Sequence, residues 1–259
     1  MSRFQILNVL YIAALAFIAI TERYSTGIEY KVLLLRFLSY IFILFLGVVF
    51  TQLNLFVEHE LAGNARYNEI ALSFDDGPNA KFTPQVLDKL SQYNVKAGFF
   101  LIGQKADKYP ELVKRIDKEG HLIGNHSYYH HIKFDFMRSR EARQEIELTN
   151  ESINKIIGKT PRFFRPPFGI TQPRIARAIH QSNMIPVAWS LRTYDTKKSK
   201  ARVMKILRRR LNGGDIILLH DKHPGIIEIL EFLIPYAENN GFKFVRIDEL
   251  INQKPYEIN

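Results

Sequence analysis

The chain of 259 residues contains no cysteine, and this absence excludes two kinds of structure. No disulfide can form and no thiolate can hold a metal ion, so any bound metal must be held by histidine and carboxylate side chains. A chain without cysteine is compatible with either redox compartment and therefore gives no cellular location. A glycine-rich phosphate-binding loop is also lacking after the first expected strand, which argues against a nucleotide-binding sheet.

Charged residues are almost absent from two runs near the N-terminus. Residues 4–20 carry no charge, and residues 32–50 carry only Arg36. A membrane-spanning helix needs about 20 apolar residues, with about 17 as the lower limit, and the long side chain of Arg36 can reach the interface. We therefore predict that residues 1–56 form a membrane anchor with two transmembrane helices, 4–20 and 32–50. A cleaved signal peptide is the alternative for the first run, although no small-residue cleavage site follows it.

The positive charges near these runs predict the orientation of the hairpin. Arg23, Lys31 and Arg36 lie between the two runs or just inside the second. Positively charged short loops stay in the cytoplasm. Both chain ends, and with them the large C-terminal domain, are therefore expected on the extracytoplasmic side of the cytoplasmic (inner) membrane.

Acidic residues are also missing from a strongly basic stretch. The chain has a net charge of +10, and residues 197–210 hold eight Lys or Arg and no acid. Such a patch can indicate nucleic-acid binding. However, Val203, Ile206 and Leu207 give the stretch a helical apolar stripe, so we interpret the charges as its solvated face and expect no nucleic-acid partner. An anionic membrane or an acidic cell-wall polymer would also suit this charge.

The remaining sequence has the organisation of one α/β domain. Residues 57–67 have mixed polarity and no sustained period, as in a linker, and strands and helices alternate over residues 68–259. The expected strands are 69–74, 96–102, 121–123, 162–164, 184–189, 215–219 and 242–246; the expected helices are 83–93, 110–119, 139–157, 173–181, 199–211 and 225–238. About seven strands in roughly 190 residues are too few for a complete eight-stranded barrel of about 250 residues. We predict a distorted, incomplete β/α barrel, with an open doubly wound sheet as the alternative.

Polar clusters follow or end five of the expected strands. In chain order they are Ser73-Phe74-Asp75-Asp76-Gly77-Pro78, His126-Ser127-Tyr128-Tyr129-His130, Arg165-Pro166-Pro167-Phe168-Gly169, Asp195, and Leu218-Leu219-His220. In barrels of alternating strands and helices, residues at the carboxyl ends of the strands face one shared cleft. We therefore expect these clusters to meet in a single site.

Two of the clusters supply the ligands of a catalytic metal. His126 and His130 are four residues apart and would point the same way on a helical turn, whereas His131 would point away and is excluded. Two imidazoles and one carboxylate are the protein ligands of an open, catalytic zinc site. Asp75 and Asp76 project in different directions, so one can hold the metal while the other faces the attacking water. Zinc is our first choice, with cobalt, nickel and manganese as alternatives.

Two further groups suit proton transfer in the same site. Arg165 precedes two prolines, which restrict its backbone, and its guanidinium can hold a carboxylate and keep it ionised. His220 ends the expected strand 215–219. Taken alone, a histidine at this position is as often a structural residue at a strand end.

The five ordered motifs resemble those of the polysaccharide deacetylases of carbohydrate esterase family 4, the chitooligosaccharide deacetylase homology domain, over residues 68 to 250. This resemblance implies that residues 68–259 are a catalytic domain. It implies that Asp75 is the catalytic base and that Arg165 pairs with it. The metal would be held by Asp76, His126 and His130. The remaining implied roles are oxyanion binding by the Phe168 amide, a pocket for the acetyl methyl group at Leu218, and a general acid, His220, oriented by Asp195.

The fourth motif departs from the family pattern. The family usually has Asp-x-x-Asp-Trp, whereas this chain has Arg192-Thr193-Tyr194-Asp195-Thr196. Asp195 is kept, but Arg192 replaces the first acid and Thr196 replaces the Trp that walls the acetate pocket. The substitutions leave open the shape of the substrate site, and also whether Trp189, the only Trp in the chain, reaches the same wall.

The resemblance implies a metal-dependent hydrolase that removes N-acetyl groups from peptidoglycan or a chitin-like glycan and releases acetate. Three alternatives use the same scaffold or sequence. The first is an esterase of O-acetylated glycans, or a deformylase of a lipid-linked sugar. The second is a non-catalytic glycan-binding membrane protein, and the third is a membrane protein whose C-terminal domain only anchors partners.

Overall fold

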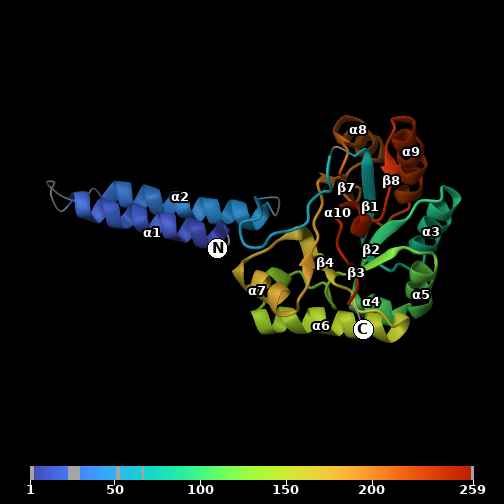
Figure 1. Cartoon of the computed structure of the whole chain (residues 1–259), viewed down its shortest axis with the longest axis horizontal. Helices are drawn as coiled ribbons and strands as arrows, with labels where there is room; N and C mark the ends of the chain where they lie inside the picture. The colour runs from blue at the N-terminus through green and yellow to red at the C-terminus, as the bar shows by residue number, and fades with distance from the viewer. Residues whose placement is uncertain (1–2, 23–29, 51–52, 66, 258–259) are drawn as a thin grey trace.

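A computed structural model describes residues 3–22, 30–50, 53–65 and 67–257 (Figure 1). Two long helices, α1 (Arg3–Glu22) and α2 (Tyr30–Val49), lie antiparallel and project from one side of an α/β domain. The rings of Tyr11 and Tyr40 stack between them with centroids 4.3 Å apart. Because the helices form a hairpin, the start of α1 and the end of α2 both lie beside the α/β domain.

The two helices cover the two predicted apolar runs. Within the described chain, the segment Lys31–Val49 of α2 is long and apolar enough to cross a membrane, whereas the apolar segment Arg3–Ile18 of α1 is shorter. Almost none of the α2 segment is covered by other parts of the chain. The membrane role of the hairpin, the linker at 57–67 and the domain boundaries remain predictions. Arg23, used above for the orientation, lies outside the described residues.

The α/β domain is built on one curled sheet in which all strand pairs are parallel. Its strands are β1 (Glu69–Gly77), β2 (Ala97–Leu101), β3 (Leu122–Asn125), β4 (Phe163–Phe164), β5 (Ile185–Pro186), β6 (Leu191–Arg192), β7 (Ile216–His220) and β8 (Lys243–Phe244). They follow the order β5-β4-β3-β2-β1-β7-β6, and β8 pairs with the start of β1. The predicted distorted, incomplete β/α barrel is confirmed.

The single strand predicted at 184–189 is wrong. Ile185 and Pro186 pair with β4, and the chain then crosses to the other edge of the sheet, where Leu191 and Arg192 pair with β7. The barrel is therefore closed by a crossing segment that lacks a continuous strand ladder. A buried guanidinium supplies the missing donors, because Arg165 donates from Nε to Val187 O and from Nη2 to Ala188 O.

The predicted helices agree with the structure to within two residues. They are α3 (Phe82–Gln92), α5 (Pro110–Lys118), α6 (Ser139–Ile157), α7 (Pro173–Gln181), α8 (Lys200–Arg210) and α9 (Gly225–Asn239). Two short helices, α4 (Gly103–Lys108) and α10 (Ile247–Ile251), were not predicted. With six and five residues, they are too short to show a helical apolar period.

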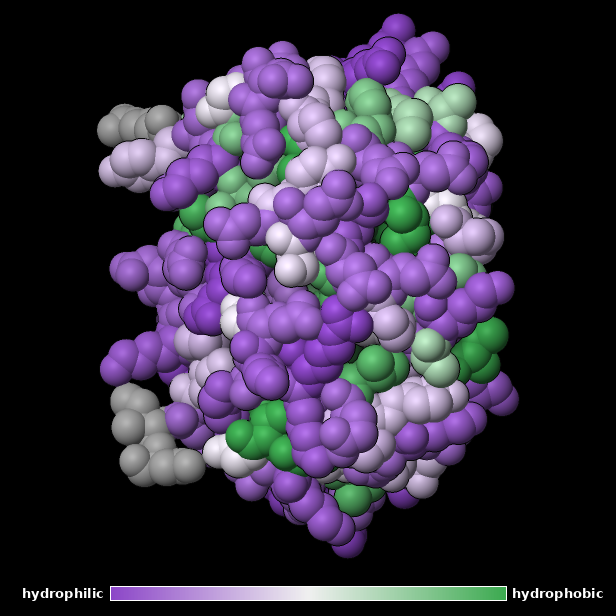
Figure 2. All heavy atoms as spheres, turned by 90° about the vertical axis from the view of Figure 1, so that its right-hand side faces the viewer, coloured by the Kyte–Doolittle hydropathy of each residue, from purple (hydrophilic) through white to green (hydrophobic). Residues whose placement is uncertain are grey.

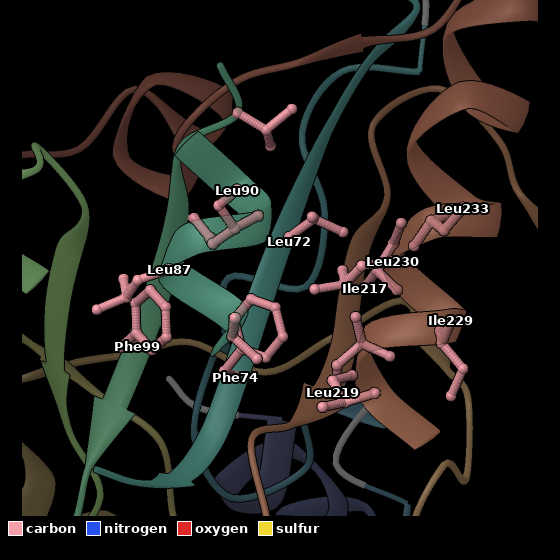
Figure 3. Packing of buried hydrophobic residues seen from close by; sticks show 14 of the residues in the cluster. Leu72, Phe74, Leu87, Leu90, Phe99, Ile217, Leu219, Ile229, Leu230 and Leu233 are labelled. Atoms are coloured by element: carbon pink, nitrogen blue, oxygen red, sulfur yellow. The ribbon is translucent and has the colours of Figure 1, made fainter. Parts of the chain in front are cut away.

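Side chains on β1 alternate between two different environments. Ile70, Leu72 and Phe74 belong to the main hydrophobic cluster, which packs under α3 and α9 (Figure 3). Phe74 stacks on Phe99 of β2 with ring centroids 5.0 Å apart. Because successive side chains of a strand point to opposite faces, Ser73 and Asp75 lie on the other face of the sheet, where Arg165 bonds to both. The outer face of α3, α5 and α9 is largely hydrophilic (Figure 2).

Candidate active site

The ends of β1, β3 and β7 bring the predicted site residues to one cavity of about 230 Å³. Every predicted site residue lines it except Arg165 and Asp195, which are buried outside its lining. The lining residues are Asp75, Asp76, His126, His130, Phe168, Gly169, Trp189, Arg192, Tyr194, Thr196, Lys197, Leu218, His220 and Lys222. Parallel strands therefore gather the motifs as the sequence predicts.

Asp76, His126 and His130 form a cluster that fits a divalent metal ion. One ligand atom from each lies within 4.8 Å of the others. Asp76 Oδ1 is 3.4 Å from Nε2 of His126 and 3.2 Å from Nε2 of His130. Nδ1 of His126 lies 2.7 Å from the carbonyl oxygen of Arg165 and donates to it, which leaves the lone pair of Nε2 facing Asp76. Burial, with the nearby His126, lowers the pKa of His130 to about 4, so this imidazole is neutral and can also act as a ligand.

The predicted helical turn at 126–130 is wrong, although the two histidines do converge. Ser127 and His130 both have left-handed backbone conformations, with φ of 62° and 52°. Ser127 Oγ accepts a hydrogen bond from the His130 amide at 3.1 Å. Glu145 of α6 accepts the amides of Tyr128 and Tyr129 at 3.0 and 2.8 Å. A tight loop anchored by a buried carboxylate, in place of a helix, therefore sets the direction of the two rings.

His131 is not expected to be a metal ligand, because it would point away from His126 and His130. Its side chain is exposed, and it is not part of the metal-ligating cluster.

Asp75 is held by the fully buried Arg165. Nη1 of Arg165 donates to Asp75 Oδ1 at 2.7 Å and to Ser73 Oγ at 2.8 Å, and the guanidinium carbon lies 3.9 Å from the centre of the Phe100 ring. The other carboxylate oxygen, Oδ2, is 3.9 Å from Nε2 of His126. Arg165 therefore fixes one oxygen of Asp75 and leaves the other beside the metal-ligating cluster.

Two lysines that the sequence did not single out contact Asp76. Lys105 of α4 donates to the Asp76 carbonyl oxygen at 2.6 Å, and Lys222 forms an ion pair with Asp76 Oδ2. Burial alone would raise the pKa of Asp76, but His126, Lys222 and His130 outweigh it and hold that pKa well below its ordinary value. Neither lysine could be distinguished from a surface lysine in the sequence, because its role depends on where β1 ends.

His220 and Asp195 form a second hydrogen-bonded group. Nδ1 of His220 lies 3.0 Å from Asp195 Oδ1, and the His220 amide donates to Asp195 Oδ2 at 2.8 Å. Burial lowers the pKa of His220, but the hydrogen bond to Asp195 and its charge more than offset this, so the pKa is raised. Since Nδ1 faces Asp195, Nε2 is the ring nitrogen left for the cavity.

A further histidine, which the sequence analysis missed, shares the same carboxylate. Nε2 of His223 lies 3.0 Å from Asp195 Oδ2. Burial opposes ionisation of Asp195, but its contacts with His220 and His223 hold its pKa well below the ordinary value. The spacing of His220 and His223 gave no sign that both rings would reach one aspartate.

Phe168, Leu218 and Trp189 form the less polar part of the cavity wall. Phe168 has a left-handed backbone, with φ of 58°, and its ring meets the ring of His130 edge-on at 4.9 Å. Trp189 lines the same cavity as Thr196, which stands where the family usually has Trp. Gly169 permits this approach, because a Cβ at its position would lie 2.1 Å from Cη2 of Trp189.

Comparison with known proteins places the sequence and the fold in one family. The sequence profile of the polysaccharide deacetylases matches residues 62–187. A peptidoglycan-N-acetylglucosamine deacetylase of Bacillus cereus is 40% identical over 202 residues, which cover 74% of this chain and 72% of that protein. The peptidoglycan-N-acetylmuramic acid deacetylase PdaA of Bacillus subtilis is 32% identical over 211 residues, which cover 78% of this chain and 80% of that protein.

A solved structure gives the same result. The crystal structure of a peptidoglycan N-acetylglucosamine deacetylase in complex with 4-naphthalen-1-yl-N-oxidanyl-benzamide superposes with a TM-score of 0.73 at 35% identity. The match covers 77% of this chain and 95% of that chain. The chain therefore belongs to the polysaccharide deacetylase family and is an enzyme of that class, a hydrolase of linear amides. The family is metal-dependent, and the cluster of Asp76, His126 and His130 provides a place for the ion.

Proposed function

We propose that this protein removes N-acetyl groups from the amino sugars of peptidoglycan and releases acetate. The observation that carries the proposal is the placement of two proton-transfer groups around one metal-ligating cluster. Asp75 forms an ion pair with the buried Arg165, and Asp195 raises the pKa of His220 through its hydrogen bond and charge. Amide hydrolysis needs such a pair, because one group must take a proton from water and the other must give one to the departing nitrogen. The peptidoglycan deacetylases among the relatives support the choice of glycan.

Asp76, His126 and His130 would hold the metal ion. Two imidazoles and a carboxylate favour Zn²⁺, with Co²⁺, Ni²⁺ and Mn²⁺ as alternatives. When bound, such an ion supplies Lewis acidity, which polarises the acetyl carbonyl and lowers the pKa of a water.

The other residues perform the proton transfers and position the acetyl group. Asp75 accepts a proton from the attacking water through Oδ2, since Oδ1 is occupied by Arg165. A C–O bond forms at the acetyl carbon, and the C–N bond breaks as His220 gives its Nε2 proton to the sugar nitrogen. The Phe168 amide stabilises the oxyanion. Leu218 and Trp189 enclose the acetyl methyl group.

We propose that residues 1–56 anchor the enzyme in the cytoplasmic membrane with the catalytic domain, residues 68–259, outside the cytoplasm. The antiparallel packing of α1 and α2 supports this, because it brings both ends of the hairpin to the catalytic domain. Lys31 and Arg36 lie toward the opposite end of the hairpin. A reporter that is active only in the cytoplasm, fused after Asn259, should remain silent, and a strong signal from it would refute this orientation.

The function is tested on the full chain in detergent. Bound metal is measured by mass spectrometry, and acetate release is compared for peptidoglycan, N-acetylglucosamine oligomers and acetylated xylan. We expect a divalent ion, with acetate released from the amino-sugar substrates and free amines in the product. Acetate from xylan alone would indicate an O-acetyl esterase, and formate from a formylated sugar would indicate a deformylase. Glycan binding without any product would refute an enzymatic role.

A further inference from the structure

A second cavity, of about 320 Å³, adjoins the active site on the side of the hairpin. The two cavities share Phe168, Gly169, Trp189, Arg192 and Tyr194 in their walls. The far wall of the second cavity is formed by Val49 at the end of α2, by the next residue, Phe50, and by Arg210 at the end of α8. A molecule bound in the catalytic cavity can therefore extend toward the end of the apolar helix.

The charged side chains that line this second cavity are all positive. Its walls contain two arginines and, within the described part of the chain, no acidic residue. Arg192 is half-buried and Arg210 is exposed. Neither forms an ion pair with a described residue, although the charge of Arg210 opposes the rise that burial causes in the pKa of Asp215. Arginine presents a planar set of donors that suits carboxylate and phosphate oxygens. The cavity thus offers two unpaired guanidinium groups to an anion.

Arg192 is held in place by aromatic rings. Its guanidinium carbon lies 5.3 Å from the centre of the Trp189 ring and 5.0 Å from the centre of the Tyr194 ring. Tyr194 has a left-handed backbone, with φ of 59°, and the centre of its ring also lies 5.3 Å from Nζ of Lys198. Contacts with aromatic faces restrict a guanidinium without using its hydrogen-bond donors. Arg192 is therefore pre-oriented, and its donors remain available for a ligand.

We propose that this second cavity binds the diphosphate of a lipid-linked N-acetyl sugar, so that the enzyme deacetylates the sugar while it is still attached to a membrane carrier. This inference deepens the proposed function and rests on it. The acetylated sugar lies in the catalytic cavity, the diphosphate contacts Arg192 and Arg210, and the lipid leaves past Val49 and Phe50 along α2. The apolar wall at Val49 and Phe50 favours a lipid-borne phosphate, because a lipid chain can pack against it. A soluble glycan with carboxylates has no apolar group to contact that wall.

The test compares four substrates on the full chain in detergent. They carry the same N-acetyl sugar as a neutral oligomer, as a soluble diphosphate ester, as a lipid diphosphate, and as a glycan with carboxylates and no phosphate. For the wild type we expect kcat/KM to be highest for the lipid diphosphate and lowest for the neutral oligomer. Loss of one arginine-to-phosphate contact should change binding by about tenfold.

The variants Arg192→Gln and Arg210→Gln locate the effect. In both, the ratio of kcat/KM for the lipid diphosphate to that for the neutral oligomer should fall about tenfold, mainly through KM. The matched control is Lys205→Gln, an exposed cation on the same helix as Arg210 and outside both cavities, which should leave all four substrates unchanged.

The results that would contradict these expectations distinguish failure of the inference from failure of the proposed function. Equal kcat/KM for the neutral and lipid-linked sugars, or an unchanged ratio in both arginine variants, overturns the inference. Equal use of the soluble and lipid diphosphates, or equal arginine dependence for the carboxylate glycan, overturns the lipid-phosphate assignment. If the wild type releases no acetate from any of these substrates or from peptidoglycan, the proposed function itself has failed.

Discussion

His223 places Nε2 3.0 Å from Oδ2 of Asp195, on the carboxylate whose other oxygen contacts His220. Asp195 therefore divides its negative charge between two imidazoles. A second hydrogen-bond donor on a carboxylate weakens the stabilisation that the carboxylate gives to the positive charge of the first donor. We therefore expect His223 to be a positioning residue that moderates the effect of Asp195 on His220.

Replacing His223 should alter the pH dependence of the enzyme. In His223→Ala, Asp195 interacts more strongly with His220, so the pKa of His220 rises and the basic limb of the kcat/KM profile moves to higher pH. We expect a shift of about 0.5 pH unit and a loss of a few-fold in kcat, within the range of a single hydrogen bond. His223→Gln, which retains a donor, should restore most of the wild-type profile. Superimposable profiles for the wild type and His223→Ala would show that His223 has only a structural role.

Replacing Asp75 should separate catalysis from metal binding. Asp75→Asn keeps the shape of the side chain but cannot accept the water proton, so kcat should fall by about 10²–10⁴-fold. The cluster of Asp76, His126 and His130 is intact in this variant, so metal content should stay close to that of the wild type. Turnover and metal content are measured on the same preparation. Retention of most of the rate would show that another group is the base.

Much of this site could be predicted because its residues follow buried strands. The apolar run of β1 fixes the position of Asp75, and parallel strands bring His126 and His220 to the same end of the sheet. The direction of the histidine pair could not be predicted, since it depends on the left-handed conformations of Ser127 and His130.

Contacts between distant parts of the chain could not be predicted either. The break in the strand predicted at 184–189 depends on a guanidinium that arrives from the end of β4. In the same way, Lys222 and His223 acquire their roles only because the turn after β7 lies over Asp76 and Asp195.

Adjacent histidines offer a sharp test of the metal ligands. His130 belongs to the ligand cluster, whereas His131 is exposed and outside it. Chelator treatment should abolish wild-type activity, and added Zn²⁺ should restore it. His130→Gln should lose most bound metal and recover little activity at the same Zn²⁺ concentration, while His131→Gln should match the wild type. Equal metal content in the two variants would remove His130 from the ligand set.

Arg165 should stabilise the fold as well as the site. Arg165→Met leaves Asp75 as an unpaired buried charge and removes the donors to the carbonyl groups of Val187 and Ala188. Loss of one partner of a buried ion pair typically lowers the free energy of unfolding by about 3–5 kcal/mol. The control Arg162→Met removes a partly exposed arginine from the same segment and should cost less than about 1 kcal/mol.

A double variant tests whether the ion pair causes that loss. Arg165→Met combined with Asp75→Asn no longer buries an unpaired charge, so it should be less destabilised than the sum of the two single variants. Denaturant unfolding can be followed by the fluorescence of Trp189, the only Trp in the chain. If the losses in free energy of unfolding of the two single variants simply add in the double variant, Arg165 stabilises the fold through its carbonyl contacts and not through the ion pair.

His121 should make the catalytic domain less stable in mild acid. His121 is buried just before β3, beside the start of β2. Its Nδ1 accepts a hydrogen bond from the Ala97 amide at 3.2 Å, so this nitrogen carries no proton. Burial, with the positive charge of Lys96, lowers the pKa of His121 from 6.5 to about 4. Between these values the unfolded chain binds a proton that the folded chain does not. Stability contributed by neutral His121 is therefore complete above pH 6.5 and decreases as the pH falls toward 4, by about 2–3 kcal/mol in all.

The variant His121→Gln isolates this contribution, because its amide oxygen can still accept from Ala97 but does not titrate. Unfolding should be measured with chelator present, so that loss of a metal ion at low pH does not enter the comparison. The wild type should lose more stability than His121→Gln between pH 7 and 4.5, and the difference between the two curves belongs to His121 since all other titrating groups are shared. Parallel curves would mean that the ring is protonated in the folded state at a pH near 6.5, which would require the Ala97 amide to give up its acceptor.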